Sequence, residues 1–317
     1  MNISICITVF NEEKTISGLL DSLISQSKKP DEIIIVDGGS KDKTIEIIRH
    51  FQKRYGNIKL LTENCSRSAG RNISVDVAKN EIIATTDAGC IVHKNWLKNI
   101  TEPFVNREVD IVAGFYEMTG RSSMQKAMAI FLGVMPSKFD INFLPSTRSM
   151  AFRKKAWEEI GGFPEGRENS AEDTDFNYKA LRLGLKYARV KTAIVEWGMP
   201  EDLTAFFNKI SDYAKWDIRY GIWWNPAQRF ASHNIKALSV LFRYLIALLI
   251  LIYCFYKPPL FPIPVILIFA YFVWSYRKVF SEFQKASIAV WGPILQIVCD
   301  FGVMNGFLRG LVLKGAS

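Results

Sequence analysis

Short apolar runs alternate with segments of helical periodicity along residues 1–90. The apolar runs, rich in β-branched residues, are ISICITVF (3–10), EIIIV (32–36), KLLTEN (59–64) and EIIATTDAGC (81–90). Apolar positions at helical spacing fill the intervening residues 13–27, 44–55 and 66–79. Strands that alternate with helices are typical of an open, mostly parallel sheet, so the pattern predicts an α/β fold. In such sheets, ligands bind at the carboxyl ends of the strands.

The pattern is less regular after residue 110. DIVAGFY (110–116) predicts a strand, and residues 121–148 read as an irregular stretch. SMAFRKKAWEEIGGFPEG (149–166) predicts a strand, a short helix and a turn. EDTDFNYKALRLG (172–184) predicts a helix, with Gly184 at its carboxyl end.

Residues 203–221 have the pattern of a basic amphipathic helix. Their apolar residues recur at a helical period, and Lys209, Lys215 and Arg219 share the polar side. Such a helix suits a membrane interface, and a packed core helix is the alternative. The apolar segments that follow favour the membrane.

Residues 237–256 are 20 long and contain one charge, Arg243, and residues 258–276 contain none. A membrane-spanning helix needs about 20 apolar residues, so both segments qualify. Segment 288–313 is long enough, but its polar residues allow it either to span or to lie in the interface. The loop 277–285 is mostly basic, so the positive-inside rule predicts that it is cytoplasmic. We therefore expect a cytoplasmic domain over 1–235 and a membrane domain with two or three spans over 236–317.

The composition excludes several functional classes. The net charge of +9 fits a solvated basic surface, or attraction to anionic lipid headgroups or phosphorylated substrates. Nucleic-acid binding is not expected, because no Lys/Arg block or nucleic-acid motif occurs. The five cysteines are far apart and show no metal-binding spacing. No strand is followed by GxGxxG or by a P-loop, which argues against dinucleotide and P-loop proteins.

Polar residues follow three of the predicted strands, at Thr8–Glu12, Asp37 and Asp87. We expect these strand ends to meet at one edge of the sheet. Carboxylates that converge there require a cation or a ligand rich in hydrogen-bond donors.

The chain resembles the family 2 glycosyltransferases, which are inverting enzymes of the GT-A fold. The resemblance covers residues 1–190, and a membrane tail is common in that family. The stretches that carry it, in order, are TVFNEE (8–13), VDGGSKDKT (36–44), RSAGRN (67–72), TTDAGC (85–90) and AEDTDF (171–176).

The resemblance implies a nucleotide site. It assigns the nucleoside to Thr8, Phe10, Glu12 and Asp37, with Arg71 near the nucleotide. A carboxylate such as Asp37 accepts hydrogen bonds from a base N–H or from ribose hydroxyls; a simple Asp-Gly turn is the alternative. Gly38 replaces the second acid of the family's usual Asp-Asp-Gly-Ser, which leaves the base open between uracil and guanine.

The resemblance also implies a metal and a catalytic base. Asp87 matches the first acid of the family's Asp-x-Asp motif for Mg²⁺ or Mn²⁺, whereas Gly89 stands at its third position. Glu172 and Asp173 match the acceptor-site motif, with Asp173 at the position of the base that deprotonates the acceptor hydroxyl. The alternative for Asp173 is an acid at a helix N-terminus. An ionised lipid phosphate as acceptor would need no base.

The sequence thus predicts a membrane-anchored, metal-dependent glycosyltransferase. It would transfer a sugar from a UDP- or GDP-sugar to a lipid-linked acceptor at the cytoplasmic face. A polyprenyl phosphate with a lone phosphate is the alternative acceptor. A non-catalytic membrane subunit that binds a nucleotide sugar is the alternative function, because Gly38 and Gly89 replace acids. The oligomeric state, a homo-oligomer included, is left open.

Overall fold

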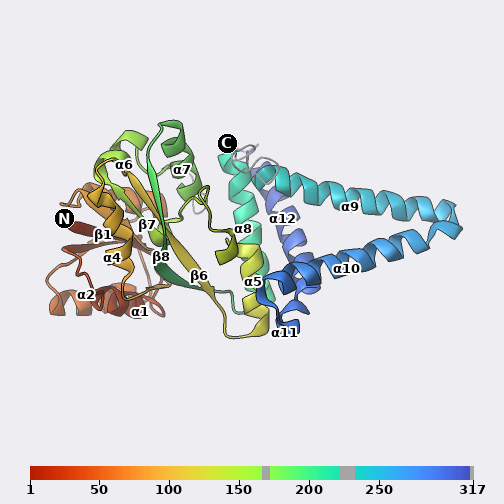
Figure 1. Cartoon of the computed structure of the whole chain (residues 1–317), viewed down its shortest axis with the longest axis horizontal. Coiled ribbons are helices and arrows are strands. Elements are labelled where there is room, and N and C mark those ends of the chain that lie inside the picture. Colours follow the sequence, from red (N-terminus) through yellow and green to blue (C-terminus); the bar gives the residue numbers. More distant parts are fainter. Residues whose placement is uncertain (166–171, 222–232, 315–317) are drawn as a thin grey trace. The chain divides into compact units, whose positions relative to one another are not determined.

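The computed structural model describes residues 1–165, 172–221 and 233–314 (Figure 1). The chain divides into two compact units. The first comprises Met1–Glu117 and Phe139–Gly198, and the second comprises Met118–Lys138 and Met199–Ser317.

The first unit is built around a sheet of eight strands in the order β3-β2-β1-β4-β7-β6-β8-β5. Pairing is parallel from β3 to β4, whereas β7 runs antiparallel to β4 and β6. The predicted α/β fold with a mostly parallel sheet is therefore confirmed. The strands are β1 (Ile3–Val9), β2 (Glu32–Asp37), β3 (Ile58–Thr62), β4 (Ile82–Thr85), β5 (Cys90–Val92), β6 (Ile111–Thr119), β7 (Met150–Arg153) and β8 (Tyr187–Gly198).

Helices connect these strands at the positions that the periodicity predicts. The central strands β1, β2 and β4 are apolar and buried on both faces, as expected where helices cover a parallel sheet. The helices and helical turns are α1 (Ile16–Ile24), α2 (Thr44–Arg54), α3 (Arg67–Asp76), α4 (Trp96–Thr101), η1 (Glu102–Val105), η3 (Thr147–Ser149), α6 (Lys154–Ile160) and α7 (Glu172–Arg182).

The antiparallel strand β7 determines what else reaches the active edge of the sheet. Met150, the first residue of β7, pairs with Thr85, the last residue of β4. The residues just before β7 therefore lie at the edge where the parallel strands end. Sequence periodicity could not reveal this, because it gives no strand direction.

The second unit is helical. Its helices are α5 (Ser123–Leu132), η2 (Pro136–Lys138), α8 (Leu203–Tyr220), α9 (His233–Tyr256), η5 (Pro258–Leu260), α10 (Pro262–Phe283), α11 (Ala286–Ala289) and α12 (Gly292–Lys314). The helix predicted at 203–221 is confirmed as α8. The prediction of irregular structure over 121–148 is wrong for α5, which opens with a capping box between Ser122 and Gln125.

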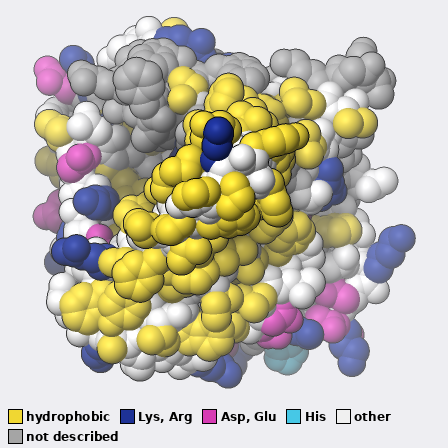
Figure 2. All heavy atoms as spheres, turned by 90° about the vertical axis from the view of Figure 1, so that its right-hand side faces the viewer, with side chains coloured by type: hydrophobic (Ala, Val, Ile, Leu, Met, Phe, Trp, Pro, Cys, Tyr) yellow, Lys and Arg dark blue, Asp and Glu magenta, His cyan; other side chains and the backbone are white. Residues whose placement is uncertain are grey.

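Three helical stretches of this unit are long and apolar enough to cross a membrane: Asn234–Tyr256, Pro258–Phe283 and Ala286–Val312. α9 and α10 form a hairpin whose apolar side chains are largely exposed. Figure 2 faces the hairpin end and shows hydrophobic side chains gathered across it. Exposed apolar surface on this scale marks an interaction with lipid or protein.

Helix α12 packs along α8 through a glycine seam. A Cβ built on Gly306 would lie 2.1 Å from the Ser211 carbonyl oxygen, and one on Gly310 would lie 2.8 Å from the Lys215 carbonyl oxygen. Gly302 meets Ile210 in the same way, at 3.0 Å. Small residues at every fourth position let two helix backbones approach closely. The order of these contacts shows that α8 and α12 run parallel.

We expect Gly306→Ala to separate α8 from α12. The added methyl group would overlap the backbone of Ser211, a clash that costs about 2 kcal/mol or more. Thermal unfolding of the purified protein, followed by tryptophan fluorescence, should show a lower Tm. Gly198→Ala is the matched control, because a Cβ there meets nothing within 4 Å; equal Tm values for the two variants would contradict a tight seam.

Candidate active site

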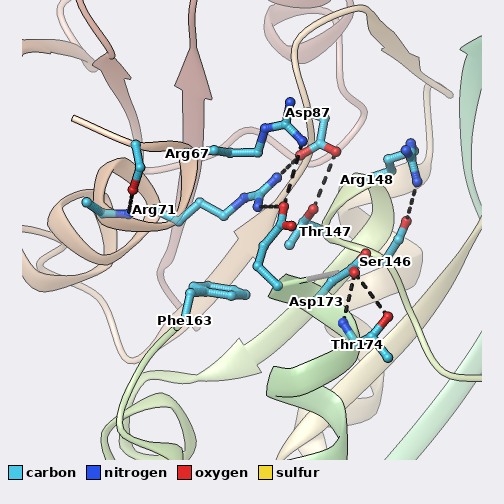
Figure 3. Close-up of polar contacts among 12 residues, drawn as sticks. Arg67, Arg71, Asp87, Ser146, Thr147, Arg148, Phe163, Asp173 and Thr174 are labelled. Atoms are coloured by element: carbon cyan, nitrogen blue, oxygen red, sulfur yellow. Dashed lines mark hydrogen bonds and ion pairs between the residues drawn. The ribbon is translucent and has the colours of Figure 1, made fainter. Parts of the chain in front are cut away.

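Arg71 and Asp87 form the centre of the polar cluster at the carboxyl edge of the sheet (Figure 3). The buried Arg71 guanidinium donates from Nη2 to Asp87 Oδ1 at 2.7 Å and from Nη1 to Glu172 Oε1. Arg67 Nη1 lies 3.8 Å from the same Glu172 oxygen, with half of its side chain exposed. One buried arginine therefore bridges a strand-end carboxylate and the first residue of α7.

The position of Arg71 follows from how α3 begins and packs. Ser66 caps the helix by accepting a hydrogen bond from the Ala69 backbone N–H. A Cβ built on Gly70 would lie 2.6 Å from the Thr8 methyl group, so only glycine lets α3 come this close to β1. Arg71 is thereby directed along the strand ends, with its Cζ 5.8 Å from the centre of the Phe163 ring.

Asp87 and Glu172 are held ionised by the arginines. Burial opposes ionisation of Asp87, but the charges of Arg71, Arg148 and Arg67 outweigh it and lower its pKa to about 2. Burial likewise opposes ionisation of Glu172, yet Arg71 and Arg67 lower its pKa. The same two carboxylates raise the pKa of Arg71 against the opposing effect of burial. The cluster thus carries fixed charges at neutral pH.

Asp173 has the opposite electrostatic environment. Burial is the largest cause, and the charge of Glu172 adds to it, so the pKa of Asp173 is raised to about 6. Its Oδ1 accepts a hydrogen bond from the Thr174 backbone N–H at 2.8 Å. Neighbouring carboxylates whose pKa values are pushed apart are characteristic of acid–base sites.

Two residues of this edge escaped the sequence analysis. Thr147 donates to Asp87 Oδ2 at 3.3 Å, and the charge of Arg148 acts on both Asp87 and Asp173. The Arg148 guanidinium lies 3.9 Å from the centre of the Trp197 ring and 5.6 Å from that of Tyr116. Both residues belong to the stretch read as irregular, and no motif signals them.

Asp37 closes a tight turn and leaves one oxygen without a partner. Its Oδ2 accepts hydrogen bonds from the backbone N–H groups of Gly39 and Ser40, each at 2.9 Å. Gly39 has φ +94°, a conformation that favours glycine. Asp37 Oδ1 is buried and has no hydrogen-bond partner among the described residues; the same is true of the hydroxyl groups of Thr8 and Thr86. Unpartnered buried oxygens at strand ends are what a bound ligand would satisfy.

The remaining predicted residues lie around this edge. Phe10 follows β1 and is 57% exposed. Glu12 accepts a hydrogen bond from the Thr15 hydroxyl group, and its Oε2 lies 3.9 Å from a Cβ built on Gly89. Gly89 has φ +81°, so an acid is disfavoured there, and Glu12 brings a carboxylate close to that place.

Other motif residues serve structure. The side chain of Asn72 donates to the Phe163 carbonyl group and accepts from Trp157 Nε1, so it holds the turn after α6 rather than the polar cluster. Asp175 pairs with Lys179 at 3.2 Å on α7. Ala171, which opens the AEDTDF stretch, lies outside the described residues. Within the described ranges, no group of three or more acidic, histidine or cysteine side chains is arranged to hold a metal by itself.

A family model described as "Glycosyl transferase family 2" matches residues 4–168. "Glycosyltransferase AglE" of Haloferax volcanii is 29% identical over 169 residues, which cover 51% of this chain and 56% of that protein. The "Dolichyl N-acetyl-alpha-D-glucosaminyl phosphate 3-beta-D-2,3-diacetamido-2,3-dideoxy-beta-D-glucuronosyltransferase" of Methanococcus voltae is 34% identical over 119 residues, or 35% of this chain and 37% of that protein. The chain thus spans little more than half of the length of the first of these relatives and less of the second.

A solved structure shares the fold over nearly the whole chain. It is titled "Mannosyltransferase PcManGT from Pyrobaculum calidifontis in complex with GDP-Man and Mn2+" and gives a TM-score of 0.64 at 17% identity, covering 99% of this chain and 88% of that chain. This likeness concerns the fold, and it agrees with the GT-A fold predicted from the sequence.

Proposed function

Because the chain belongs to glycosyl transferase family 2, we propose that it is an inverting glycosyltransferase. Its donor would be a nucleotide-diphosphate sugar, and its acceptor would be a lipid-linked molecule at the membrane surface. The observation that carries this proposal is the strand edge itself, where unpartnered buried oxygens at Thr8 and Asp37 adjoin the charged pair of Arg71 and Asp87.

The donor would lie across this edge. Asp37 Oδ1 and the Thr8 hydroxyl group would accept or exchange hydrogen bonds with the base and ribose, and the exposed ring of Phe10 would contact the nucleoside. Arg71 would face the diphosphate, because a guanidinium group binds phosphate oxygens well. The titles of two structural neighbours name GDP-Man and UDP as bound molecules, which supports a nucleotide-sugar donor.

A divalent metal fits this edge if phosphate oxygens supply most of its ligands. Asp87 is ionised and a quarter exposed, with Glu12 as a second carboxylate near Gly89. Mg²⁺ and Mn²⁺ prefer oxygen ligands. When bound, the metal would neutralise charge on the departing nucleoside diphosphate. Arg71 would fix the orientation of the Asp87 carboxylate through its bond to Oδ1.

Asp173 would act as the base. Ionised Asp173 would take the proton from the acceptor hydroxyl group as that oxygen attacks the anomeric carbon, which inverts the configuration. Arg148 and Glu172 would orient the acceptor and the base. The name of the Methanococcus voltae relative includes a dolichyl phosphate sugar, which supports a lipid-linked acceptor.

The second unit would attach the enzyme to the membrane. The α9–α10 hairpin would enter the lipid, in keeping with its exposed apolar surface. α8 carries charged residues along its length, so it would lie at the headgroup level, and α12 would share this level because the glycine seam ties it to α8. The domain boundary near 235, the anchoring over 236–317 and the cytoplasmic orientation are parts of this proposal.

The test of the proposed function is donor binding by the full-length protein in nanodiscs. A panel of UDP- and GDP-sugars would be titrated with and without Mn²⁺, and transfer to polyprenyl-linked acceptors would be assayed by mass spectrometry. We expect one donor to bind, with Mn²⁺ strengthening its affinity by about tenfold or more in the wild type but not in Asp87→Asn. Asp76→Asn, an exposed acid at the end of α3, is the control.

The alternative function, a non-catalytic nucleotide-sugar-binding subunit, is favoured by Gly38 and Gly89 at positions where the family has acids. It predicts donor binding without transfer or donor hydrolysis for any acceptor tested. Failure to bind any donor would contradict both functions.

We expect Asp37→Asn to weaken donor binding about 10- to 100-fold. The amide oxygen of asparagine can keep the turn by accepting from Gly39 and Ser40, while its NH₂ group replaces the unpartnered acceptor Oδ1 with a donor. The change therefore alters one hydrogen-bonding atom without removing the turn. Isothermal titration would measure the donor Kd, with Glu63→Gln, an exposed acid after β3, as the control. An unchanged Kd would mean that Asp37 only shapes the turn.

A further inference from the structure

A second polar cluster joins three helices of the membrane unit, far in sequence from the residues described above. Asp300 of α12 is 1% exposed. Its Oδ2 lies 2.5 Å from Arg243 Nη2 of α9 and accepts hydrogen bonds from the hydroxyl groups of Tyr244 and Tyr271. Its Oδ1 accepts from Gln296 Nε2 at 2.9 Å. All the hydrogen-bonding capacity of one buried carboxylate is thus directed to the junction of α9, α10 and α12.

The cluster holds more positive than negative charge. Lys278 Nζ of α10 donates to Gln296 Oε1 at 3.1 Å and lies 4.1 Å from the centre of the Phe131 ring. Lys236 and Arg243 both act electrostatically on Lys278. Of these three cations, Arg243 alone pairs with a carboxylate within 4.0 Å in the described ranges. Lys236, Arg243 and Lys278 therefore face one acid, Asp300.

This excess charge lies where the lipid-facing surface begins. From Phe242 toward the tip of the hairpin, α9 exposes apolar side chains, and α10 does so up to Trp274. Arg243 Nε and Nη2 are buried, and neither has a hydrogen-bond acceptor in the part of the chain that the structure describes. Cations that adjoin a lipid-facing surface are costly unless an anion compensates them.

A purely structural tie does not require all three cations. Arg243 and Asp300 are sufficient to connect α9 with α12, and the two tyrosines complete that connection. Lys236 and Lys278 add repulsion to this pair, because like charges in a partly desolvated site disfavour each other. Their presence points to an anion supplied from outside the protein.

We propose that this junction, Lys236, Arg243 and Lys278, binds the phosphate group of a membrane lipid. Phosphate is the anion present at the boundary between headgroups and hydrocarbon, and its oxygens accept the hydrogen bonds that Arg243 Nε and Lys278 donate. The lipid chains would lie along the exposed apolar surface of α9 and α10. The inference rests on the proposed membrane attachment, but it does not depend on sugar transfer.

Two sources share this chemistry: a bilayer phospholipid and a polyprenyl phosphate. The full-length protein, delipidated in a neutral detergent, would be titrated with phosphatidylglycerol, a polyprenyl phosphate, phosphatidylcholine and inorganic phosphate. Native mass spectrometry would count the bound molecules. We expect one phosphate-bearing anionic lipid to bind at least about tenfold more tightly than phosphatidylcholine. Whichever anionic lipid binds more tightly identifies the source.

The variants Lys278→Gln and Lys236→Gln test the site without breaking the Arg243–Asp300 pair. We expect each to weaken binding of the anionic lipid about threefold to tenfold, and the double variant more. Lys257→Gln, an exposed lysine at the tip of the same hairpin, is the control and should bind as the wild type does. Equal affinity of all variants for the anionic lipid, or equal binding of phosphatidylcholine, would overturn the proposal. Donor binding in the same samples separates this result from a failure of the proposed function.

Discussion

Asp173→Asn is expected to reduce sugar transfer by about 10²- to 10⁴-fold while leaving the donor Kd within about twofold of the wild type. Asparagine keeps the size of the side chain but cannot accept the proton of the acceptor hydroxyl group. Donor affinity should persist because Asp37, Arg71 and Asp87 are unchanged. The measurement is kcat with a saturating acceptor, together with the donor Kd by titration. Asp175→Asn, two residues further along α7 and paired with Lys179, is the control.

The pH dependence of the wild type is part of the same expectation. With the pKa of Asp173 raised to about 6, the base is protonated at lower pH, so kcat should rise as the pH increases through about 6. Asp173→Asn should lack this rise. A variant that keeps more than about a tenth of the wild-type rate would sink the assignment of the base and favour an ionised phosphate as acceptor.

Asp173 should also cost stability. Its pKa in the folded protein exceeds the ordinary value of 3.8, so the folded state binds the proton more tightly and loses stability as the pH rises from about 4 to 6. Asp173→Asn removes this cost, which is at most about 3 kcal/mol. The inactive variant is therefore expected to have a higher Tm at pH 7 than the wild type. Active sites commonly exchange stability for function in this way.

Arg71→Met is expected to destabilise the protein by about 3–5 kcal/mol, equivalent to a decrease in Tm of roughly 10 °C. Methionine fills part of the volume but leaves Asp87 and Glu172 without the cation that both contact. Donor binding should also be lost, because Asp87 would no longer be held in position. Thermal unfolding followed by tryptophan fluorescence would measure the Tm, and titration would measure the donor Kd.

The matched control for that variant is Arg67→Met. Arg67 lies on the same face of α3, but it is half exposed and 3.8 Å from Glu172, so its loss should cost less than about 1 kcal/mol. The difference between wild type and Arg71→Met should narrow in acid. The pKa of Asp87 is lowered to about 2, so the stability that Arg71 gives this carboxylate is lost as the pH falls from about 4 toward 2. Equal Tm values for the two variants would contradict a central role for Arg71.

The arrangement of strands and helices in the first unit was predictable because burial on both sides of a parallel sheet leaves a strong local pattern. The apolar runs of β1, β2 and β4 and the amphipathic helices between them are visible in the sequence. The same reasoning predicted α8 and the long apolar helices of the second unit. β8 was missed because its residues are mostly half-buried and include several lysines and arginines.

The candidate site was predictable only in part. Asp37 and Asp87 were recognised because each follows a parallel strand, and strand direction alone brings such ends together. Thr147 and Arg148 were not recognised, since they reach the site through the antiparallel return of β7. Asn72 was associated with the nucleotide by the motif, yet its side chain holds the turn after α6.

By itself the sequence determined the α/β fold, the family resemblance and the apolar hairpin, since these depend on local periodicity and on motifs in order. Only the tertiary structure decided that Arg71 joins Asp87 to Glu172, 101 residues away, and that α12 packs on α8 through glycines. It alone showed the raised pKa of Asp173 and the excess positive charge around Asp300. The physical reason is that burial and charge interactions depend on distances in space, which the order of residues along the chain does not contain.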